Sequence, residues 1–184
     1  MTVSPVGSKL RARTLIQQNV ARHDSVANTY DARHPEINNP TEQRRLRRTI
    51  QDIVSHVPAT NRRALDFGAG TGNLTSKLLS HGLEVWAADV SQGMLNVLAR
   101  REAVTAGEAR LHTQLLTGEF PLAFPDAYFG LAAAYSVLHH VPDYREAVRE
   151  LARVVAPGGV LLIDHEHNAD HWRSPFGVRL HRLL

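Results

Sequence analysis

The run Leu65-Asp66-Phe67-Gly68-Ala69-Gly70-Thr71-Gly72-Asn73 decides the fold of this chain. A short apolar segment leads into it and a segment of helical spacing follows, so we expect a strand, a tight turn and a helix. Glycine at every second position lets the backbone turn sharply and approach a ligand closely. A carboxylate beside such a turn suits a ligand with a positive or hydroxyl-rich end. The run therefore predicts a site for a nucleotide-like cofactor.

From Arg62 onward, apolar segments alternate with segments of helical spacing. The predicted strands cover residues 64–67, 83–90, 109–116, 128–138 and 160–165. Helices are expected between them, one capped by Ser91 and one begun by the capping pair Asp143 and Glu146. Alternating strands and helices indicate an α/β fold with a doubly wound, mostly parallel sheet. Ligands bind such sheets at the carboxyl ends of the strands, so we expect the glycine turn to lie there.

The N-terminal third has a different pattern. Residues 8–22 are weakly helical, the segment from Asp24 to Pro40 reads as an irregular connection, and a helix capped by Thr41 runs to Pro58. We interpret residues 1–60 as an N-terminal helical lid or cap. Residues 61–184 are then the cofactor-binding α/β core, which is short at its C-terminal end.

Composition excludes several classes of protein. The chain has 184 residues, a formal net charge of +3 and no cysteine, which excludes disulfides, thiolate metal sites and cysteine nucleophiles. The apolar run at residues 127–138 is too short to span a bilayer, so a cytoplasmic protein is the default expectation. Arg44-Arg45-Leu46-Arg47-Arg48 is typical of a solvated helix face. Contact with an anionic partner is the alternative, but no interleaved aromatic residues favour nucleic acid.

Two classes of cofactor compete for the glycine turn. A dinucleotide fingerprint, G-x-G-x-x-G/A, needs a small residue at position 73, where this chain has asparagine. That mismatch disfavours a nicotinamide-dependent oxidoreductase. The pattern from Asp66 to Gly72 is instead D-x-G-x-G-x-G, which resembles motif I of the class I S-adenosylmethionine-dependent methyltransferases. Asp89 ends the next strand, where a carboxylate can accept hydrogen bonds from both ribose hydroxyls.

The resemblance extends over roughly residues 26–167 and is closest to the methyltransferases of ubiquinone and menaquinone biosynthesis, the type 11 group. Five further segments match the family in the right order. They are Val26-Ala27-Asn28-Thr29-Tyr30-Asp31, Asp89-Val90-Ser91-Gln92-Gly93-Met94-Leu95, Phe124-Pro125-Asp126-Ala127-Tyr128-Phe129, Ser136-Val137-Leu138-His139-His140-Val141 and Leu151-Ala152-Arg153-Val154-Val155-Ala156-Pro157-Gly158-Gly159. The resemblance implies a Rossmann-like fold and S-adenosyl-L-methionine as the cofactor.

The resemblance also implies a role for each matching residue. The methionine end of the cofactor is expected at Asp66 and at the turn, with Tyr30 closing over it as a lid. Asp89 is expected to bind the ribose, and Met94 to lie near the adenine. Glu119 reaches the adenine amino group only if the alignment shifts by one residue. The full set of expected cofactor residues is Tyr30, Asp66, Gly68, Ala69, Gly70, Gly72, Asp89, Val90, Met94 and Glu119.

This chain departs from the family pattern at three places. Many relatives have Gly-Asp before the fourth strand where this chain has Gly118-Glu119, and Phe-Asp in that strand where it has Phe129-Gly130. Few residues follow the fifth predicted strand. We therefore expect a sheet that lacks the family's last two strands. The exposed edge of the fifth strand could then pair with another copy or another chain, giving a homo- or hetero-oligomer.

Histidines are the candidate groups for chemistry. His139 or His140, just after the fourth strand, could act as a general base, and a capping or packing role is the alternative. A second group follows the fifth strand and consists of Asp164, His165, Glu166, His167 and His171. Its spacing matches no zinc signature, so we expect no metal and favour a substrate-lining role.

The sequence therefore predicts methyl transfer to a small-molecule or lipid-like acceptor, on oxygen, nitrogen or carbon. The chain lacks the Asn/Asp-Pro-Pro-Tyr segment of amino-directed DNA methyltransferases, so we expect no nucleic-acid substrate. The alternative prediction is a catalytically weak or inactive methyltransferase-like subunit that binds the cofactor, a partner or both.

Overall fold

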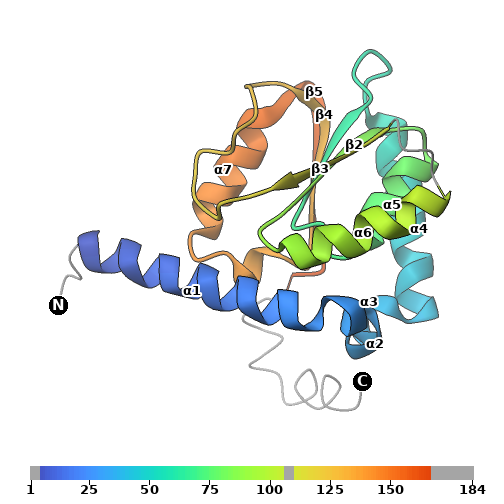
Figure 1. Cartoon of the computed structure of the whole chain (residues 1–184). Helices are drawn as coiled ribbons and strands as arrows, with labels where there is room; N and C mark the ends of the chain where they lie inside the picture. The colour runs from blue at the N-terminus through green and yellow to red at the C-terminus, as the bar shows by residue number, and fades with distance from the viewer. Residues whose placement is uncertain (1–4, 106–109, 167–184) are drawn as a thin grey trace, which may run out of the picture.

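A single parallel sheet organises the molecule. The computed structural model describes residues 5–105 and 110–166 (Figure 1). Its strands are β1 (Arg63–Phe67), β2 (Glu84–Asp89), β3 (Leu111–Leu115), β4 (Phe129–Tyr135) and β5 (Val155–Asp164). All neighbouring strands are parallel, in the order β3-β2-β1-β4-β5. The chain moves outward from β1 in one direction and then in the other, which confirms the predicted doubly wound α/β fold.

Helices cover both faces of this sheet because successive strand residues point to opposite sides. One face carries α4 (Pro40–His56), α5 (Asn73–Ser80) and α6 (Gln92–Thr105), whose apolar side chains pack on residues such as Ala64, Val85 and Leu131. The other face carries α7 (Tyr144–Val154) and the connection between β3 and β4. Figure 1 shows these two layers on either side of the strands.

Before β1, the chain is more helical than the sequence suggested. Helix α1 (Pro5–Val26) crosses the carboxyl ends of the strands in Figure 1. The segment expected to be an irregular connection forms η1 (Ala27–Thr29), α2 (Tyr30–Arg33) and α3 (Pro35–Asn38) instead. These helices are each only three or four residues long, too short to give a clear periodic pattern. The division at residue 60 into a cap and a core stays a prediction.

The cap of α4 lies two residues earlier than expected. Asn39, not Thr41, accepts hydrogen bonds from the backbone N–H groups of Thr41 and Glu42, at 3.1 and 2.9 Å. Pro40 occupies the first helical position, where its fixed φ suits the helix and its missing N–H costs nothing. At the other helices, the predicted caps are present: Asp143 accepts from Glu146 N–H and Ser91 Oγ accepts from Met94 N–H.

The end of the sheet also differs from the prediction. The Pro157-Gly158-Gly159 segment lies inside β5, which begins at Val155, and the ladder shifts register opposite Phe129–Leu131. Tyr144, the first residue of α7, is 52% exposed. The structure explains why position 130 is glycine: a Cβ there would lie 2.0 Å from the carbonyl oxygen of Asn61. Glycine at this position therefore allows the segment before β1 to pack closely against β4.

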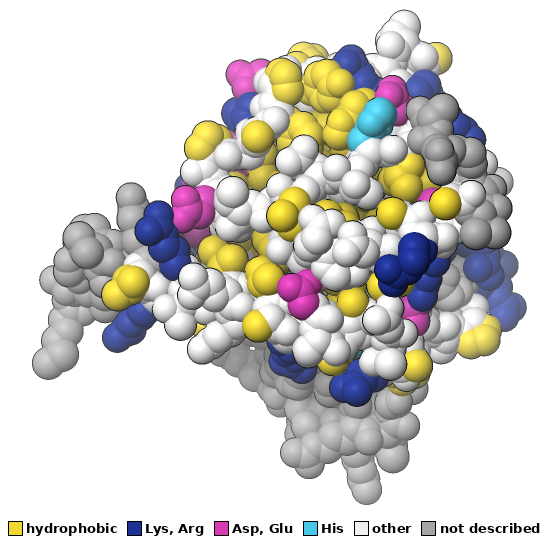
Figure 2. All heavy atoms as spheres, in the orientation of Figure 1, with side chains coloured by type: hydrophobic (Ala, Val, Ile, Leu, Met, Phe, Trp, Pro, Cys, Tyr) yellow, Lys and Arg dark blue, Asp and Glu magenta, His cyan; other side chains and the backbone are white. Residues whose placement is uncertain are grey.

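The described surface carries its positive charge in a dispersed form. On the face shown in Figure 2, Lys and Arg side chains are scattered rather than gathered into a patch. Among the described helices, none combines the length and hydropathy needed to cross a bilayer. Strand β5 pairs with β4 and with no other described strand, so its outer edge is unpaired there. His167 and His171 lie outside the described residues, and the remainder of the described chain holds no metal-ligating group of three.

Candidate cofactor-binding site

The glycine turn lies between β1 and α5, against the end of β2. Gly68, Gly70 and Gly72 have φ values of 73°, 53° and 95°, a left-handed region that glycine adopts without steric cost. The backbone N–H groups of Gly68 and Ala69 both donate to the carbonyl oxygen of Ala88, at 2.8 and 3.1 Å. A Cβ on Gly68 would lie 2.1 Å from the side chain of Val137, whereas the space beside Gly70 is open. The turn is thus closed toward β4 and open at Gly70.

A cleft with about 830 Å³ of empty space, part of it open to solvent, begins at this open side. The cleft is bounded by the ends of β1, β2 and β4 and by α1. Its lining includes the predicted residues Tyr30, Gly68, Gly70, Asp89, Val90, Met94, Glu119 and His140.

Asp89 holds the end of β2 to the glycine turn. Its two carboxylate oxygens accept from Gly70 N–H at 2.9 Å and from Ser91 N–H at 2.8 Å. Burial raises the pKa of Asp89 above the ordinary range, and the two backbone donors partly offset this. Its neighbours in the cleft, Val90 and Met94, are apolar. The carboxylate therefore lies at the polar start of a cleft whose continuation along β2 is apolar.

Asp66 lies deeper than Asp89 and faces a different hollow. It is 1% exposed and accepts a hydrogen bond of 2.6 Å from Thr75 Oγ1. Burial raises the pKa of Asp66 to about 7. The hollow beside it is smaller than the main cleft and is also lined by Tyr30, Gly68, Ala69 and Gly70. The predicted methionine-end residues are therefore together, around a carboxyl group that is close to half protonated at neutral pH.

Tyr30 begins α2 and lies between the two hollows, both of which it lines. Its ring contacts His34 at a centroid distance of 4.1 Å and His23 edge-on at 6.0 Å. Burial and nearby carboxylates raise the pKa of Tyr30 to about 12, so the phenol keeps its proton. The side chain is placed where a closing lid residue is needed, and its role as a lid stays a prediction.

Two predicted residues, Gly72 and His139, lie outside the cleft, and a third, Glu119, borders it with its carboxylate engaged elsewhere. Gly72 packs against Leu98 on α6, so it faces away from the cleft. Glu119 borders the cleft, but its carboxylate forms an ion pair of 2.8 Å with Arg13 of α1. His139 does not line the cleft, and its Nδ1 lies 2.8 Å from Glu166 Oε2. His140 is the member of the histidine pair whose ring borders the cleft.

Helix α1 contributes cleft residues that the sequence reasoning missed. Ile16, Asn19 and His23 line the cleft from above the carboxyl ends of the strands. Their spacing of three and four residues places them on one side of the helix. That spacing was the available signal, but a mixed apolar, amide and imidazole face is not the uniform apolar stripe by which a buried helix face is recognised.

Comparison with known proteins identifies the family. The model of the family described as "Methyltransferase domain" matches residues 65–163. The chain belongs to this family. The match confirms the resemblance to class I S-adenosylmethionine-dependent methyltransferases, and with it the cofactor class. The matched segment runs from the strand before the glycine turn to the end of β5, so it includes both carboxylates of the site.

Individual relatives of this methyltransferase domain cover more of the chain. It is 34% identical over 146 residues to the demethylmenaquinone methyltransferase of Renibacterium salmoninarum, a match that covers 78% of the chain and 56% of that protein. It is 36% identical over 104 residues to the ubiquinone/menaquinone biosynthesis C-methyltransferase of Vibrio vulnificus, covering 55% and 40%. The chain thus spans about half the length of these curated relatives.

A solved structure supports the fold independently. A protein from Methanococcus maripaludis, assigned as an S-adenosyl-L-methionine-dependent methyltransferase, superposes with a TM-score of 0.65 at 19% identity. The match covers 86% of this chain and 71% of that protein. At this identity the likeness concerns the fold alone, which is the Rossmann-like class I methyltransferase fold.

The residues present fit S-adenosylmethionine. Open space at Gly70 allows a ligand to approach the turn, and Asp89 offers carboxylate oxygens beside it. The apolar wall formed by Val90, Met94 and Leu116 suits a flat ring system. At the other side of the turn, the buried carboxyl of Asp66 suits an ammonium group. These features follow the order of the cofactor's parts, from adenine through ribose to the amino acid.

Proposed function

We propose that this chain transfers the sulfonium methyl group of S-adenosylmethionine to a small-molecule or lipid-like acceptor. The observation that carries the proposal is the pair of hollows that meet at the glycine turn: Asp89 and His140 line the main cleft, Asp66 lines the smaller hollow, and Tyr30, Gly68 and Gly70 line both. The names of the relatives point to demethylmenaquinone as the first acceptor to test, with methylation at carbon. A quinol is an aromatic acceptor, and the cleft is lined mostly by apolar side chains.

The protein's part in this reaction is binding, orientation and exclusion of water. When bound, the cofactor supplies an activated methyl group. Asp89 and the turn hold its ribose end, and Asp66 and Tyr30 surround the amino-acid end. Helix α1 crosses the carboxyl ends of the strands (Figure 1) and lines one side of the cleft, where it would limit access of water to the reacting atoms.

Calorimetry with S-adenosylhomocysteine tests the cofactor part of the proposal. We expect saturable binding by the full chain, and a loss of affinity of roughly ten- to a hundredfold in Asp89→Ala, because each hydrogen bond to a charged group is worth about 1.5–3 kcal/mol. The exposed substitution Asp52→Ala on α4 is the control and should leave the affinity unchanged. Failure of the folded wild-type protein to bind S-adenosylhomocysteine would reject the proposal.

Transfer itself is measured with labelled S-adenosylmethionine and a panel of acceptors that begins with a short-chain demethylmenaquinol. Label in the extracted quinol supports carbon methylation of this acceptor class. Label in another acceptor keeps methyl transfer and replaces the acceptor. Binding of the cofactor with no transfer to any acceptor would instead favour a catalytically weak or inactive subunit.

A further inference from the structure

We propose that His23 of α1 and His140 form a pair of imidazole bases that receives the proton of the methyl acceptor. This inference rests on the proposed methyl transfer and adds a residue from α1 to the reaction. The motif reasoning pointed to His139 and His140, which are adjacent in sequence. The structure places only one of these two in the cleft and sets a third histidine against it.

The first support is the geometry of the two rings. The centroids of His23 and His140 lie 5.4 Å apart with the ring planes at 87°, an edge-to-face contact. The other side of His23 meets the ring of Tyr30 edge-on, at 6.0 Å. All three side chains line the main cleft. Within the described part of the chain, no hydrogen bond occupies the ring nitrogens of His23 or His140, so these nitrogens are available to a ligand.

The second support is that α1 is tied to the core on both sides of His23. One turn earlier, Asn19 Nδ2 donates to the carbonyl oxygen of His140 at 3.0 Å. One residue later, Asp24 Oδ1 accepts from Gly93 N–H at 2.9 Å and from the hydroxyl of Ser91. These contacts fix the distance between the two imidazoles. They join the start of α6, which follows β2, to the turn that follows β4.

The surroundings of His23 favour its uncharged form. Burial lowers the pKa of His23 below its usual value. Arg22 and His34 lower it further, whereas Asp89 and Asp24 oppose the shift. At neutral pH the ring therefore carries a lone pair on one nitrogen and can accept a proton.

His140 is affected in the same direction. Burial against the cleft walls lowers the pKa of His140 well below its usual value, and His139, His23 and Arg22 add to the effect. Glu166 opposes it. Because two imidazolium ions in contact would repel each other, the pair takes up one proton, which both rings are needed to accommodate.

His139 is in a different situation, although it is the neighbouring residue. The Glu166 carboxylate accepts from the backbone N–H groups of Val137, Leu138 and His139 at 2.8, 2.7 and 3.2 Å, and it also contacts His139 Nδ1. By binding Glu166, the side chain of His139 helps to hold the turn that positions His140. His139 is a positioning residue in this proposal.

The proposed step balances without a further reactant. The acceptor atom forms a bond to the methyl carbon while the carbon–sulfur bond breaks, and the electron pair of that bond stays on sulfur. The acceptor's proton passes to a ring nitrogen of His23 or His140. The products are the methylated acceptor, S-adenosylhomocysteine and one imidazolium, which returns its proton to water after the products leave.

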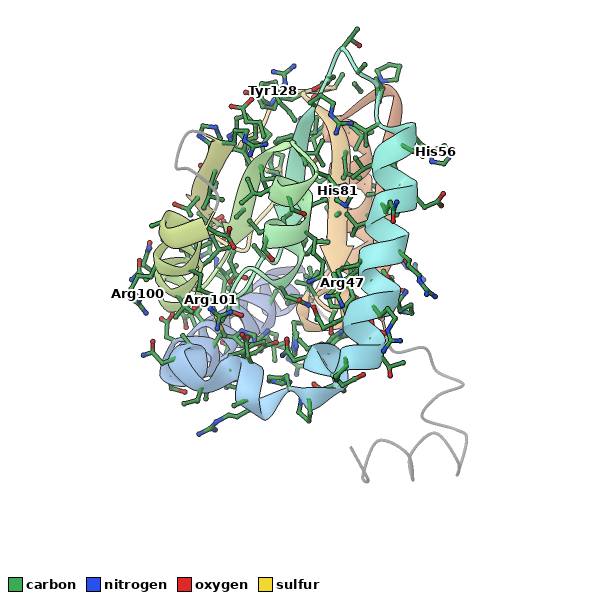
Figure 3. All side chains as sticks on the ribbon, turned by 90° about the vertical axis from the view of Figure 1, so that its right-hand side faces the viewer. Arg47, His56, His81, Arg100, Arg101 and Tyr128 are labelled. Carbon is green, nitrogen blue, oxygen red and sulfur yellow. The ribbon has the colours of Figure 1, made fainter. Side chains whose placement is uncertain are left out.

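The test compares His23→Gln and His140→Gln with His56→Gln, whose exposed side chain lies at the end of α4 away from the cleft (Figure 3). Three quantities are measured in the full chain: the imidazole titrations by NMR, the Kd for S-adenosylhomocysteine, and the pH profile of methyl transfer. We expect kcat at pH 7 to fall by roughly 10²–10⁴-fold in the two cleft variants. Their Kd for S-adenosylhomocysteine should change by less than about threefold, since a proton-accepting pair acts on the other substrate.

The outcomes separate this inference from the proposed function. A wild-type protein that binds the cofactor but methylates no acceptor contradicts the proposed function, and the inference falls with it. An active wild type with a fully active His23→Gln overturns the inference alone. The same holds if His23→Gln loses cofactor affinity in proportion to its rate. His23→Gln should also shift the titration of His140, which a purely structural role of α1 would not produce.

Discussion

Asp66 shows how a single buried carboxyl group couples folding to ligand binding. Thr75 Oγ1 donates a hydrogen bond to it, and the nearby ammonium group of Lys77 favours its ionised form without outweighing burial. Burial raises its pKa to about 7, whereas an unfolded aspartate titrates near 3.9. The folded protein therefore prefers the protonated form. A ligand ammonium group would favour the ionised form, so cofactor binding is expected to strengthen as the pH rises through 7.

Replacing Asp66 with asparagine tests this coupling. Because the folded pKa is raised, the stability that the protonated group contributes is fully present below about pH 4 and is lost as the pH rises toward 7 and beyond. The amide of the variant does not ionise, and its oxygen can still accept from Thr75. We therefore expect Asp66→Asn to exceed the wild type in urea midpoint at pH 8 and to lose this advantage toward pH 5.

The control is Asp52→Asn, an exposed position on α4 that should show no such pH dependence. S-adenosylhomocysteine affinity is the second measurement. Asp66→Asn should bind more weakly than the wild type at pH 8, because an amide offers no negative charge to an ammonium group. If the stability of Asp66→Asn relative to the wild type instead decreases from pH 5 to pH 8, then Asp66 is ionised in the folded protein.

At the scale of elements, the turn after β4 depends on a residue from beyond β5. Residues 138–140 form a short helical turn whose first N–H groups have no partner within the turn. Glu166 supplies its carboxylate to these groups. Burial opposes the charge, but the bonds from His139 and from the turn hold the pKa of Glu166 below its ordinary value. The ends of β4 and β5 are thereby joined near the cleft.

We expect Glu166→Gln to loosen this turn, because the amide keeps one acceptor oxygen and loses the charge. The expected cost is about 1.5–3 kcal/mol of unfolding free energy at pH 7. Since the folded pKa is lowered, this contribution is present above the unfolded value near 4.3 and is lost as the pH falls through the folded pKa. Urea unfolding at a series of pH values from 7 downward measures it, and the difference between the two proteins should shrink as the pH falls below the unfolded value.

Amide exchange locates the effect. Faster exchange at Val137 and Leu138 in Glu166→Gln is the expected result, with Glu146→Gln on the outer side of α7 as the control. Equal exchange at these two amides in the wild type and in Glu166→Gln would contradict the assigned role.

Local signals explain which elements the sequence could predict. The glycine turn, the strands of the core and the caps at Ser91 and Asp143 depend on residues close in sequence, and they agree with the structure. The strand β5 was predicted five residues short, because a Pro-Gly-Gly segment usually ends regular structure and here lies at the edge of the sheet. The pairing of Glu166 with the turn after β4 and the contact of His23 with His140 join distant segments, for which a single sequence carries no signal.

At the scale of the whole molecule, α1 connects parts of the site that come from different strands. Its Arg13 reaches Glu119 before β4, its Asn19 reaches the turn after β4, and its Asp24 reaches the start of α6 after β2. Farther along, Arg100 and Arg101 of α6 contact Asn28 and Asp31 (Figure 3). The N-terminal helices are thus attached by these polar contacts together with a small apolar cluster of Val26, Ala27 and Tyr30 on Met94 and Val97, which can open more readily than a large apolar interface. We propose that these helices open to admit ligands and close over them.

This arrangement makes ligand affinity depend on how often α1 is closed. If only a fraction of molecules is closed, the apparent Kd rises in inverse proportion to that fraction. Asp24→Ala removes the acceptor of two hydrogen bonds between α1 and the start of α6 while leaving the described lining of the cleft intact. We therefore expect the Kd for S-adenosylhomocysteine to rise by about tenfold in this variant.

Hydrogen exchange over residues 10–26 should be faster than in the wild type before ligand is added and should slow in both proteins at saturation. Arg100→Gln, whose contact with Asn28 lies on the exposed side, is the matched control and should change the Kd by less than about twofold. Unchanged exchange over α1 in Asp24→Ala would mean that the helix is held by other contacts, and that it does not limit ligand entry.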